Sequence, residues 1–219
     1  MRVPKPSSTV RTLVVALAIT TLAGCSILPR SAPVQIWRPE TGTLAPSATR
    51  ANFSLRVGTP NVTGMLDHSG IVVLPKPGEV STYQGARWSE PPALLVRQRL
   101  VDAFMAANLT AVTTDDDHFF ADYSLSGNLR AFQTEYRHGV PVIVVRYDAL
   151  LRRSGSRQPL AFHSFVITRN ATGAQVPQVV AAFGAADDAL AHAVVAWTLV
   201  AVGHTPPAPA PGADAATRP

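Results

Sequence analysis

Alternating hydrophobic and polar positions mark the start of the folded part of the chain. Phe53, Leu55 and Val57 alternate with polar or small residues, a pattern typical of a half-buried β-strand. The β-branched run 71–73, which ends before Pro75, predicts a second strand. A folded domain is therefore expected to begin near residue 53.

A period of two returns in the second half of the chain, over segments 121–134, 141–152 and 160–169. Short turns at 137–139 and 154–156 connect these segments, and links of this length join antiparallel strands. The pattern predicts a three-stranded antiparallel meander. The central strand carries apolar residues in both alternating sets, so it is expected to be covered on much of both faces.

A period of three to four residues predicts a first amphipathic helix. Ser89 is a suitable N-cap, and Asn108 suits the left-handed conformation at the C-terminus. One predicted face is apolar and buried, and it contains Ala93, Leu94, Leu100, Val101, Phe104 and Met105. The other face is expected to be solvated, and it contains Arg97, Gln98, Arg99 and Asp102.

A second helix is predicted from Pro177 to about Val202, in an alanine-rich segment whose large apolar residues recur at three and four positions. Its last turns are apolar on the far side too. This part of the helix is either deep in the core or pressed against another copy of the chain. Asp187, Asp188 and His192 interrupt the apolar run, which leaves too short a stretch to span a bilayer.

Together these elements predict a single small α/β (α+β) domain over residues 53–202, with two main helices packed on an antiparallel sheet. The flanking segments are rich in proline and small residues and lack a sustained period. Residues 25–52 are expected to form a flexible tether, and residues 203–219 are expected to form a disordered tail.

The first 24 residues have the features of an export signal. Arg2, Lys5 and Arg11 supply positive charge ahead of a short apolar stretch, 12–22. This stretch is shorter than the roughly 20 apolar residues that a membrane-spanning helix needs. Residues 1–24 are therefore expected to form a cleaved signal peptide.

Leu22, Ala23 and Gly24 end this stretch and precede Cys25, the single cysteine of the chain. These four residues resemble the lipobox of bacterial lipoproteins. The resemblance implies that the signal is cleaved before Cys25 and that this residue carries a diacylglyceryl group and acyl chains such as palmitate. Stable anchoring needs more than one such chain. The alternative is an unmodified thiol in an ordinary signal peptide.

The charge and motif content point away from several functional classes. The formal net charge is +5, and it falls to +2 when the three basic residues of the signal are removed. The remaining basic residues do not cluster, so nucleic-acid binding is not indicated. The sequence has no Gly-x-Ser-x-Gly elbow, phosphate-binding loop or Cys/His metal spacing. We therefore predict no catalytic, cofactor-binding or metal-ligating residues, and no enzymatic activity.

Residues 114–118, Thr-Asp-Asp-Asp-His, are the most polar cluster of the chain. Carboxylate oxygens are ligands for hard cations, so a metal site is one interpretation. Successive side chains diverge along a strand or helix, however, and three adjacent carboxylates do not all face one point. A solvated acidic loop is therefore the favoured interpretation.

The order of features along the chain resembles the ABC-type transport auxiliary lipoproteins, the PqiC-like outer-membrane lipoproteins. The resemblance covers about residues 53–202. It rests on the lipobox, the tether, Leu66-Asp67, Tyr83, Arg87-Trp88-Ser89-Glu90, the segment 121–125 and a tryptophan near the end of the last helix. The long tail and the long loop at 113–118 depart from the family pattern.

The resemblance implies a location and partners. The protein would face the periplasm from the outer membrane, anchored through Cys25, and the serine at position 26 favours this membrane over the inner one. It would work with a protein that carries mammalian-cell-entry (MCE) domains, in an ABC-linked system for lipids or hydrophobic compounds. Members of the family can also assemble as homo-oligomeric rings.

Arg87, Trp88 and Trp197 are the candidate residues for a partner interface, because tryptophan and arginine are enriched at protein interfaces. For Trp88 an alternative stays open. Its side chain could instead cover the start of the first helix and serve the fold alone.

Three functions are compatible with the sequence. The first is a non-enzymatic outer-membrane component that docks a periplasmic tunnel. The second is a periplasmic lipoprotein that binds a lipid or solute on its own. The third, a hydrolase, is disfavoured because no nucleophile motif is present.

Overall fold

The computed structural model describes residues 33–48, 50–117 and 119–203. The predicted signal peptide, the lipobox, Cys25 and the tail from residue 204 onward lie outside the described residues. The described residues from Val34 to Gly203 belong to one compact unit. The description that follows concerns this unit.

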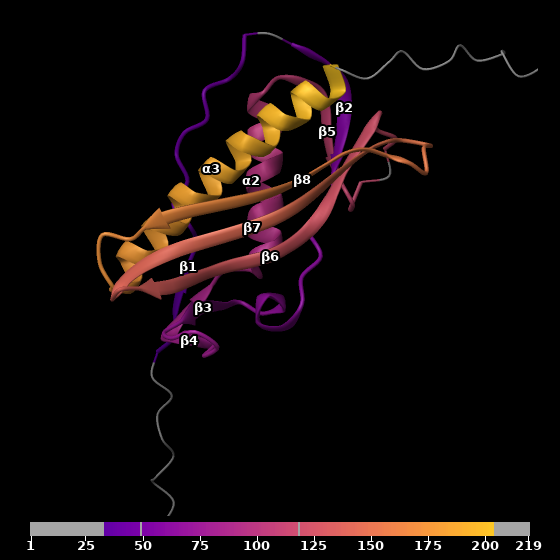
Figure 1. The fold of residues 1–219 in the computed structure, drawn as a ribbon. Coiled ribbons are helices and arrows are strands. Elements are labelled where there is room, and N and C mark those ends of the chain that lie inside the picture. The colour runs from indigo at the N-terminus through magenta and orange to yellow at the C-terminus, as the bar shows by residue number, and fades with distance from the viewer. Residues whose placement is uncertain (1–32, 49, 118, 204–219) are drawn as a thin grey trace, which may run out of the picture. The chain divides into compact units, whose positions relative to one another are not determined.

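The unit contains an eight-stranded sheet and two long helices (Figure 1). The strands are β1 (Gln35–Trp37), β2 (Ala51–Val57), β3 (Gly70–Leu74), β4 (Ser81–Trp88), β5 (Leu109–Thr114), β6 (Tyr123–Arg137), β7 (Val140–Arg153) and β8 (Pro159–Asn170). The helices are α2 (Pro92–Ala106) and α3 (Val176–Gly203), and a 3-10 turn, η1, spans Gly64–Asp67. The predicted α+β class with two main helices is confirmed.

The sheet is organised around β6. Strands β6, β7 and β8 form the predicted antiparallel meander. The rest of the sheet corrects the prediction of an antiparallel sheet, because β2 runs parallel to β5 and β6, β3 runs parallel to β6, and β1 runs parallel to β4. Parallel strands need a long crossover connection. The segment that joins β2 to its parallel neighbour β5 is such a connection, and it contains α2.

Strands β4 and β5 were missed by the sequence pattern. β4 contains Gly85 in a left-handed conformation, with φ of 67°, which interrupts its alternation. β5 begins only three residues after α2 ends and has just one buried side chain, Leu109. Neither segment carries a local signal strong enough to predict a strand.

Both helices contribute to one main core with the sheet. The largest fully buried side chains include Leu55, Ile71, Phe104, Tyr147 and Leu190. A smaller buried cluster contains Ala131, Val142 and Val144. Alternate residues at the start of β7 belong to the two clusters, but farther along the strand Arg146 and Arg152 are exposed on the face of Val142 and Val144. The predicted coverage is therefore confirmed along one face and only at the start of the other.

The predicted faces of the first helix need correction. Pro91, not Ser89, occupies the N-cap position. Met105 is 60% exposed, whereas Arg99, which was expected to be solvated, is only 6% exposed. The reason is that α2 packs against both the sheet and α3, so its buried surface is wider than one apolar stripe. The left-handed conformation of Asn108 is confirmed, with φ of 60°.

Part of the predicted tether belongs to the folded unit. β1 pairs with β4, and residues 38–48 then run along the helices before β2 begins (Figure 1). The Ser47 amide donates a hydrogen bond of 2.7 Å to the Ala106 carbonyl, at the end of α2. We call residues 38–48 the strap, and its contacts explain why the folded unit begins well before residue 53.

Candidate functional site

The three candidate interface residues have different environments. Trp88 is 1% exposed, and its ring makes edge-to-face contacts with Phe132 and Phe183 at centroid distances of 5.8 and 5.0 Å. A side chain buried in this way is unavailable to a partner, which corrects its assignment to the interface. The buried position of Trp88 agrees with a role in the fold alone.

Arg87 is exposed, as an interface residue must be. It is paired with Ile36 of β1 in the sheet. Together with His68 and neighbouring residues it lines a surface pocket of about 390 Å³. Arg87 therefore lies beside the strand with which the folded unit begins.

Trp197 lies on α3 and is partly exposed. Its ring contacts Phe165 at a centroid distance of 5.9 Å and the exposed His163 at 6.2 Å. Both partners belong to β8, so Trp197 joins the last turns of α3 to this strand at the end of the sheet.

The strap is held to α2 and α3 by an ion pair in which Arg99 is buried and Asp188 is partly exposed. Arg99 of α2 and Asp188 of α3 approach to 2.5 Å. The Gly42 amide donates to Asp188 Oδ2 at 2.7 Å, and Arg99 Nη2 donates to the Gly42 carbonyl at 2.9 Å. One peptide segment thus bonds to both members of the pair, and we call this arrangement the seam.

Gly184 allows the strap to approach α3 closely. A Cβ atom at this position would lie 1.8 Å from the Glu40 carbonyl oxygen. No side chain larger than hydrogen fits unless the strap moves. The glycine therefore belongs to the seam as much as the charged residues do.

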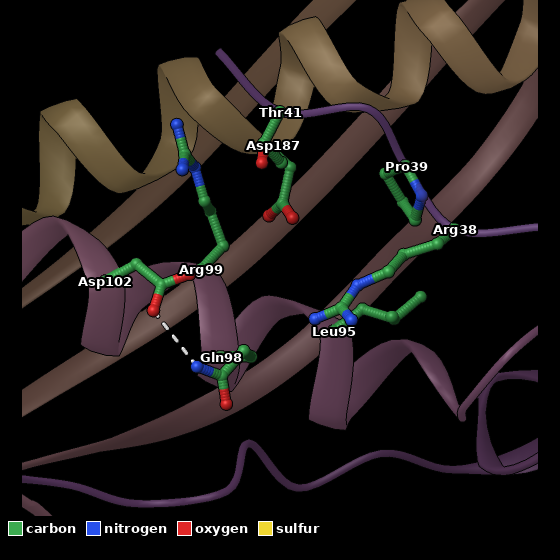
Figure 2. A pocket seen from close by; sticks show the side chains of 8 residues that line it. All are labelled: Arg38, Pro39, Thr41, Leu95, Gln98, Arg99, Asp102 and Asp187. Atoms are coloured by element: carbon green, nitrogen blue, oxygen red, sulfur yellow. Dashed lines mark hydrogen bonds between the residues drawn. The ribbon is translucent and has the colours of Figure 1, made fainter. Parts of the chain in front are cut away.

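Asp187 is buried beside the seam (Figure 2). Burial raises the pKa of this carboxyl from its ordinary value to about 8; Arg99 opposes the rise and Asp188 adds to it. Its Oδ1 atom has no hydrogen-bond partner among the described residues. The adjoining cavity, lined also by Arg38 and Asp102, holds only about 20 Å³, which is room for about one water molecule. The cavity is too small for a substrate.

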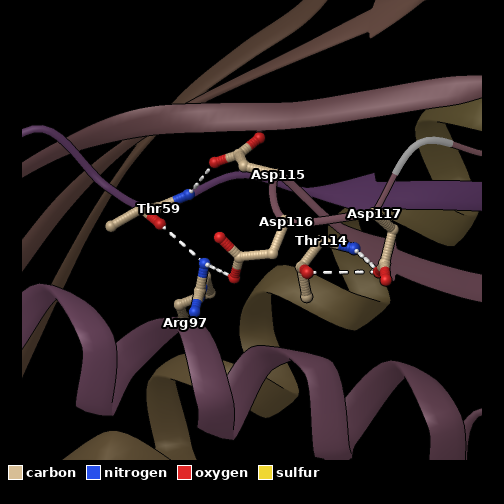
Figure 3. Close-up of polar contacts among 6 residues, drawn as sticks. All are labelled: Thr59, Arg97, Thr114, Asp115, Asp116 and Asp117. Carbon is tan, nitrogen blue, oxygen red and sulfur yellow. Dashed lines mark hydrogen bonds and ion pairs between the residues drawn. The ribbon is translucent and has the colours of Figure 1, made fainter.

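The acidic residues of the predicted loop do not converge (Figure 3). Asp115 accepts a hydrogen bond from the Thr59 amide, Asp116 pairs with Arg97, and Asp117 accepts from the amide and hydroxyl of Thr114. Within residues 33–48, 50–117 and 119–203, no cluster of three or more metal-binding side chains is found. The divergent contacts agree with the loop interpretation, and His118 lies outside the described residues.

A larger pocket, of about 610 Å³, lies where β6, β7 and the end of α3 meet. Its lining includes Phe53, Tyr123, Arg153 and Val202. Phe120, also in the lining, is 99% exposed, and such an aromatic ring is costly to leave in water. This pocket has the volume of a small-molecule site.

The seam was not predicted, although one signal for it was present. Asp187 and Asp188 interrupt an otherwise apolar helix. A carboxylate in such a stripe requires a partner or a raised pKa. The sequence does not indicate that the partner is Arg99, because the contact joins residues 89 positions apart.

α3 is long and apolar enough to cross a membrane by length and composition, but 56% of its most apolar stretch is buried in the folded unit. It packs on β7, β8 and α2. These contacts identify it as the core helix of the domain.

Comparison with known protein families agrees with this arrangement. The model of the ABC-type transport auxiliary lipoprotein component matches residues 38–195, from the start of the strap to late in α3. The chain belongs to this family. Membership in the ABC-type transport auxiliary lipoproteins makes the chain a cell-envelope lipoprotein and an auxiliary component of a transport system.

Solved structures show the same fold as this auxiliary lipoprotein. Protein XCC0632 from Xanthomonas campestris is 25% identical, with a TM-score of 0.71 over 77% of this chain and 97% of that one. A second, uncharacterised protein is 14% identical, with a TM-score of 0.60 over 76% of this chain and 99% of that one. No curated protein matches the sequence.

Proposed function

We propose that this auxiliary lipoprotein is anchored in the outer membrane through Cys25 and docks the periplasmic tunnel of an MCE-type, ABC-linked transport system. The cargo would be a lipid or another hydrophobic compound. The family match over residues 38–195 carries the proposal. The lipobox formed by Leu22, Ala23, Gly24 and Cys25 supports the anchor, and the serine at position 26 supports the outer membrane.

The role is that of a binding partner and involves no catalysis. The family description, a transport auxiliary component, supports this role. A binding partner needs an accessible surface on which the other protein can dock. Arg87 and Trp197 remain the candidate residues for this surface.

The last turns of α3 support a contact with another protein chain. Leu199 and Val200 are exposed there, next to Trp197. Exposed apolar residues that adjoin an aromatic side chain favour a protein interface. The partner at this surface would be the MCE-domain protein or, in a homo-oligomeric ring, a second copy.

The test is a pull-down of the acylated protein from native membranes in mild detergent, with the recovered proteins identified by mass spectrometry. We expect an MCE-domain protein, and Val200→Asp should lower its recovery several-fold. Val166→Asp, a change at a similarly exposed valine on β8, is the matched control and should not lower it. Arg87→Glu tests the second candidate residue. Recovery of the acylated lipoprotein alone would contradict the docking function.

A second candidate is a lipoprotein that binds a lipid or solute by itself. The pocket of about 610 Å³ with its aromatic lining favours this alternative. Native mass spectrometry of the purified protein would then detect a bound ligand that Phe120→Ala and Tyr123→Ala reduce. A consistently empty protein would exclude this function.

A further inference from the structure

The link between the lipid anchor and the folded unit is shorter than the sequence pattern suggests. The pattern assigns residues 25–52 to a tether, but pairing with β4 begins at Gln35. Val34 is only nine residues after Cys25. Nine residues span at most about 32 Å when fully extended, and a flexible chain of this length covers on the order of 20 Å.

The strap prevents the link from lengthening. After β1, the chain is held by the hydrogen bonds of Gly42 to Asp188 and Arg99 and by the close approach at Gly184. As long as these contacts persist, residues 38–48 cannot add to the length of the link between Cys25 and the folded unit. Cys25 therefore stays within about 32 Å of Val34, because the strap adds no length to the link.

The surface at β1 is apolar and unpaired. β1 is the last strand at its end of the described sheet, so one of its edges has no neighbouring strand among the described residues. Val34, just before the strand, is 53% exposed and Ile36 is 60% exposed. These are the first apolar side chains of the folded unit after the anchor.

Together, the short link and this apolar edge suggest what the edge contacts. We propose that Val34 and Ile36 lie in the headgroup region of the membrane that holds the acyl chains of Cys25. The inference rests on the proposed anchoring at Cys25. A short link maintains a high effective concentration, in the millimolar range, of the edge at the membrane. Two apolar side chains are then sufficient for a lasting contact.

The inference also orients the domain. In Figure 1 the described chain begins near β1 and β4, whereas the C-terminal end of α3 lies at the opposite end of the unit. Contact at β1 directs the last turns of α3, and the pocket lined by Phe120 and Val202, away from the lipid. This end then faces the periplasm, where the periplasmic part of a partner can reach it.

The experiment measures the depth of two spin labels in the full-length acylated protein, reconstituted in nanodiscs of phosphatidylethanolamine and phosphatidylglycerol. Cys25 is the only cysteine and is blocked by acylation, so an introduced cysteine is the single free thiol. One variant is Ile36→Cys and the other is Phe120→Cys. Accessibility to oxygen and to a water-soluble nickel complex reports whether each label lies in lipid or in water.

We expect the label at position 36 to be at headgroup depth and the label at position 120 to be in water. Adding Val34→Asp to the Ile36→Cys variant should shift the first label toward water. A label that keeps its depth in this double variant overturns the inference, because its depth would then come from the link alone. Water exposure of position 36 in wild-type background also overturns it.

Two further measurements separate this inference from the proposed function. Mass spectrometry establishes whether Cys25 is acylated, and flotation establishes whether the protein stays with the nanodiscs. Acylated, floating protein with both labels in water overturns the contact at β1 and leaves the anchor intact. Protein that lacks acyl chains and does not float overturns the anchor and, with it, the inference.

Discussion

Two ion pairs on the same helix show how position decides the role of a charge. Arg97 and Arg99 lie two residues apart on α2, and each pairs with an aspartate that belongs to an acidic run. Arg97 meets Asp116 at 3.0 Å in an exposed loop. Arg99 meets Asp188 at 2.5 Å beneath the strap.

The chemistry of the two pairs is the same, but their surroundings differ. Asp116 is largely solvated, and water and salt screen its attraction to Arg97. Arg99 is buried and shares the Gly42 peptide with Asp188. Loss of Arg99 leaves the carboxylate of Asp188 only 22% exposed, whereas loss of Arg97 leaves the carboxylate of Asp116 74% exposed to water.

The largest effect is expected for Arg99→Leu. The change leaves Asp188 without its cation and removes the hydrogen bond to Gly42, so the free energy of unfolding should fall by about 3 kcal/mol. Urea denaturation measures this loss. Arg97→Leu is the matched control on the same helix, and equal losses in the two variants would contradict the distinction between seam and loop.

Asp187 predicts a pH dependence at the seam. Its pKa is about 8 in the folded protein and near 3.8 in the unfolded chain, so between these values the folded state holds a proton that the unfolded state releases. Stability should therefore decrease as the pH rises from about 4 to about 8, by up to about 1.4 kcal/mol per pH unit from this group.

Asp187→Asn should abolish this part of the pH dependence. Urea denaturation at several pH values measures it, with the exposed Asp116→Asn as the control. If the variant and the wild type lose stability in parallel from pH 4 to 8, Asp187 is not the group responsible.

Gly184→Ala tests the contact between the strap and α3. The added methyl group would collide with the Glu40 carbonyl, so the strap must shift, and we expect a loss of about 2 kcal/mol. Hydrogen exchange of the Gly42 amide should also become faster. Gly203→Ala, where a Cβ has no neighbour within 4 Å, is the control on the same helix. Unchanged exchange at Gly42 would show that the strap tolerates the methyl group.

The smallest effect is expected for Asp116→Ala in the exposed loop. A pair of this kind contributes less than about 1 kcal/mol, and the contribution should decrease further at high salt. Thermal unfolding at low and high ionic strength measures both quantities. A loss of stability as large as that of Arg99→Leu would contradict this prediction, because the loop would then contribute as much to stability as the seam.

Local patterns account for the parts of the fold that were predicted. The meander of β6, β7 and β8 follows from alternation with a period of two, and both helices follow from their apolar periodicity. The candidate site was less predictable. Trp88 was assigned to an interface on residue type alone, but its position in the core depends on Phe132 and Phe183, which are distant in sequence.

The order of neighbouring residues is enough to predict the family, the α+β class, the meander and the two helices, because each of these leaves a local pattern. The burial of Arg99 but not of Arg97, the mixed sheet and the place of the strap in the folded unit leave no such pattern. These features depend on contacts between residues far apart in the chain, such as Gly42, Arg99 and Asp188. Periodicity within one segment carries no information about which distant segment will cover it.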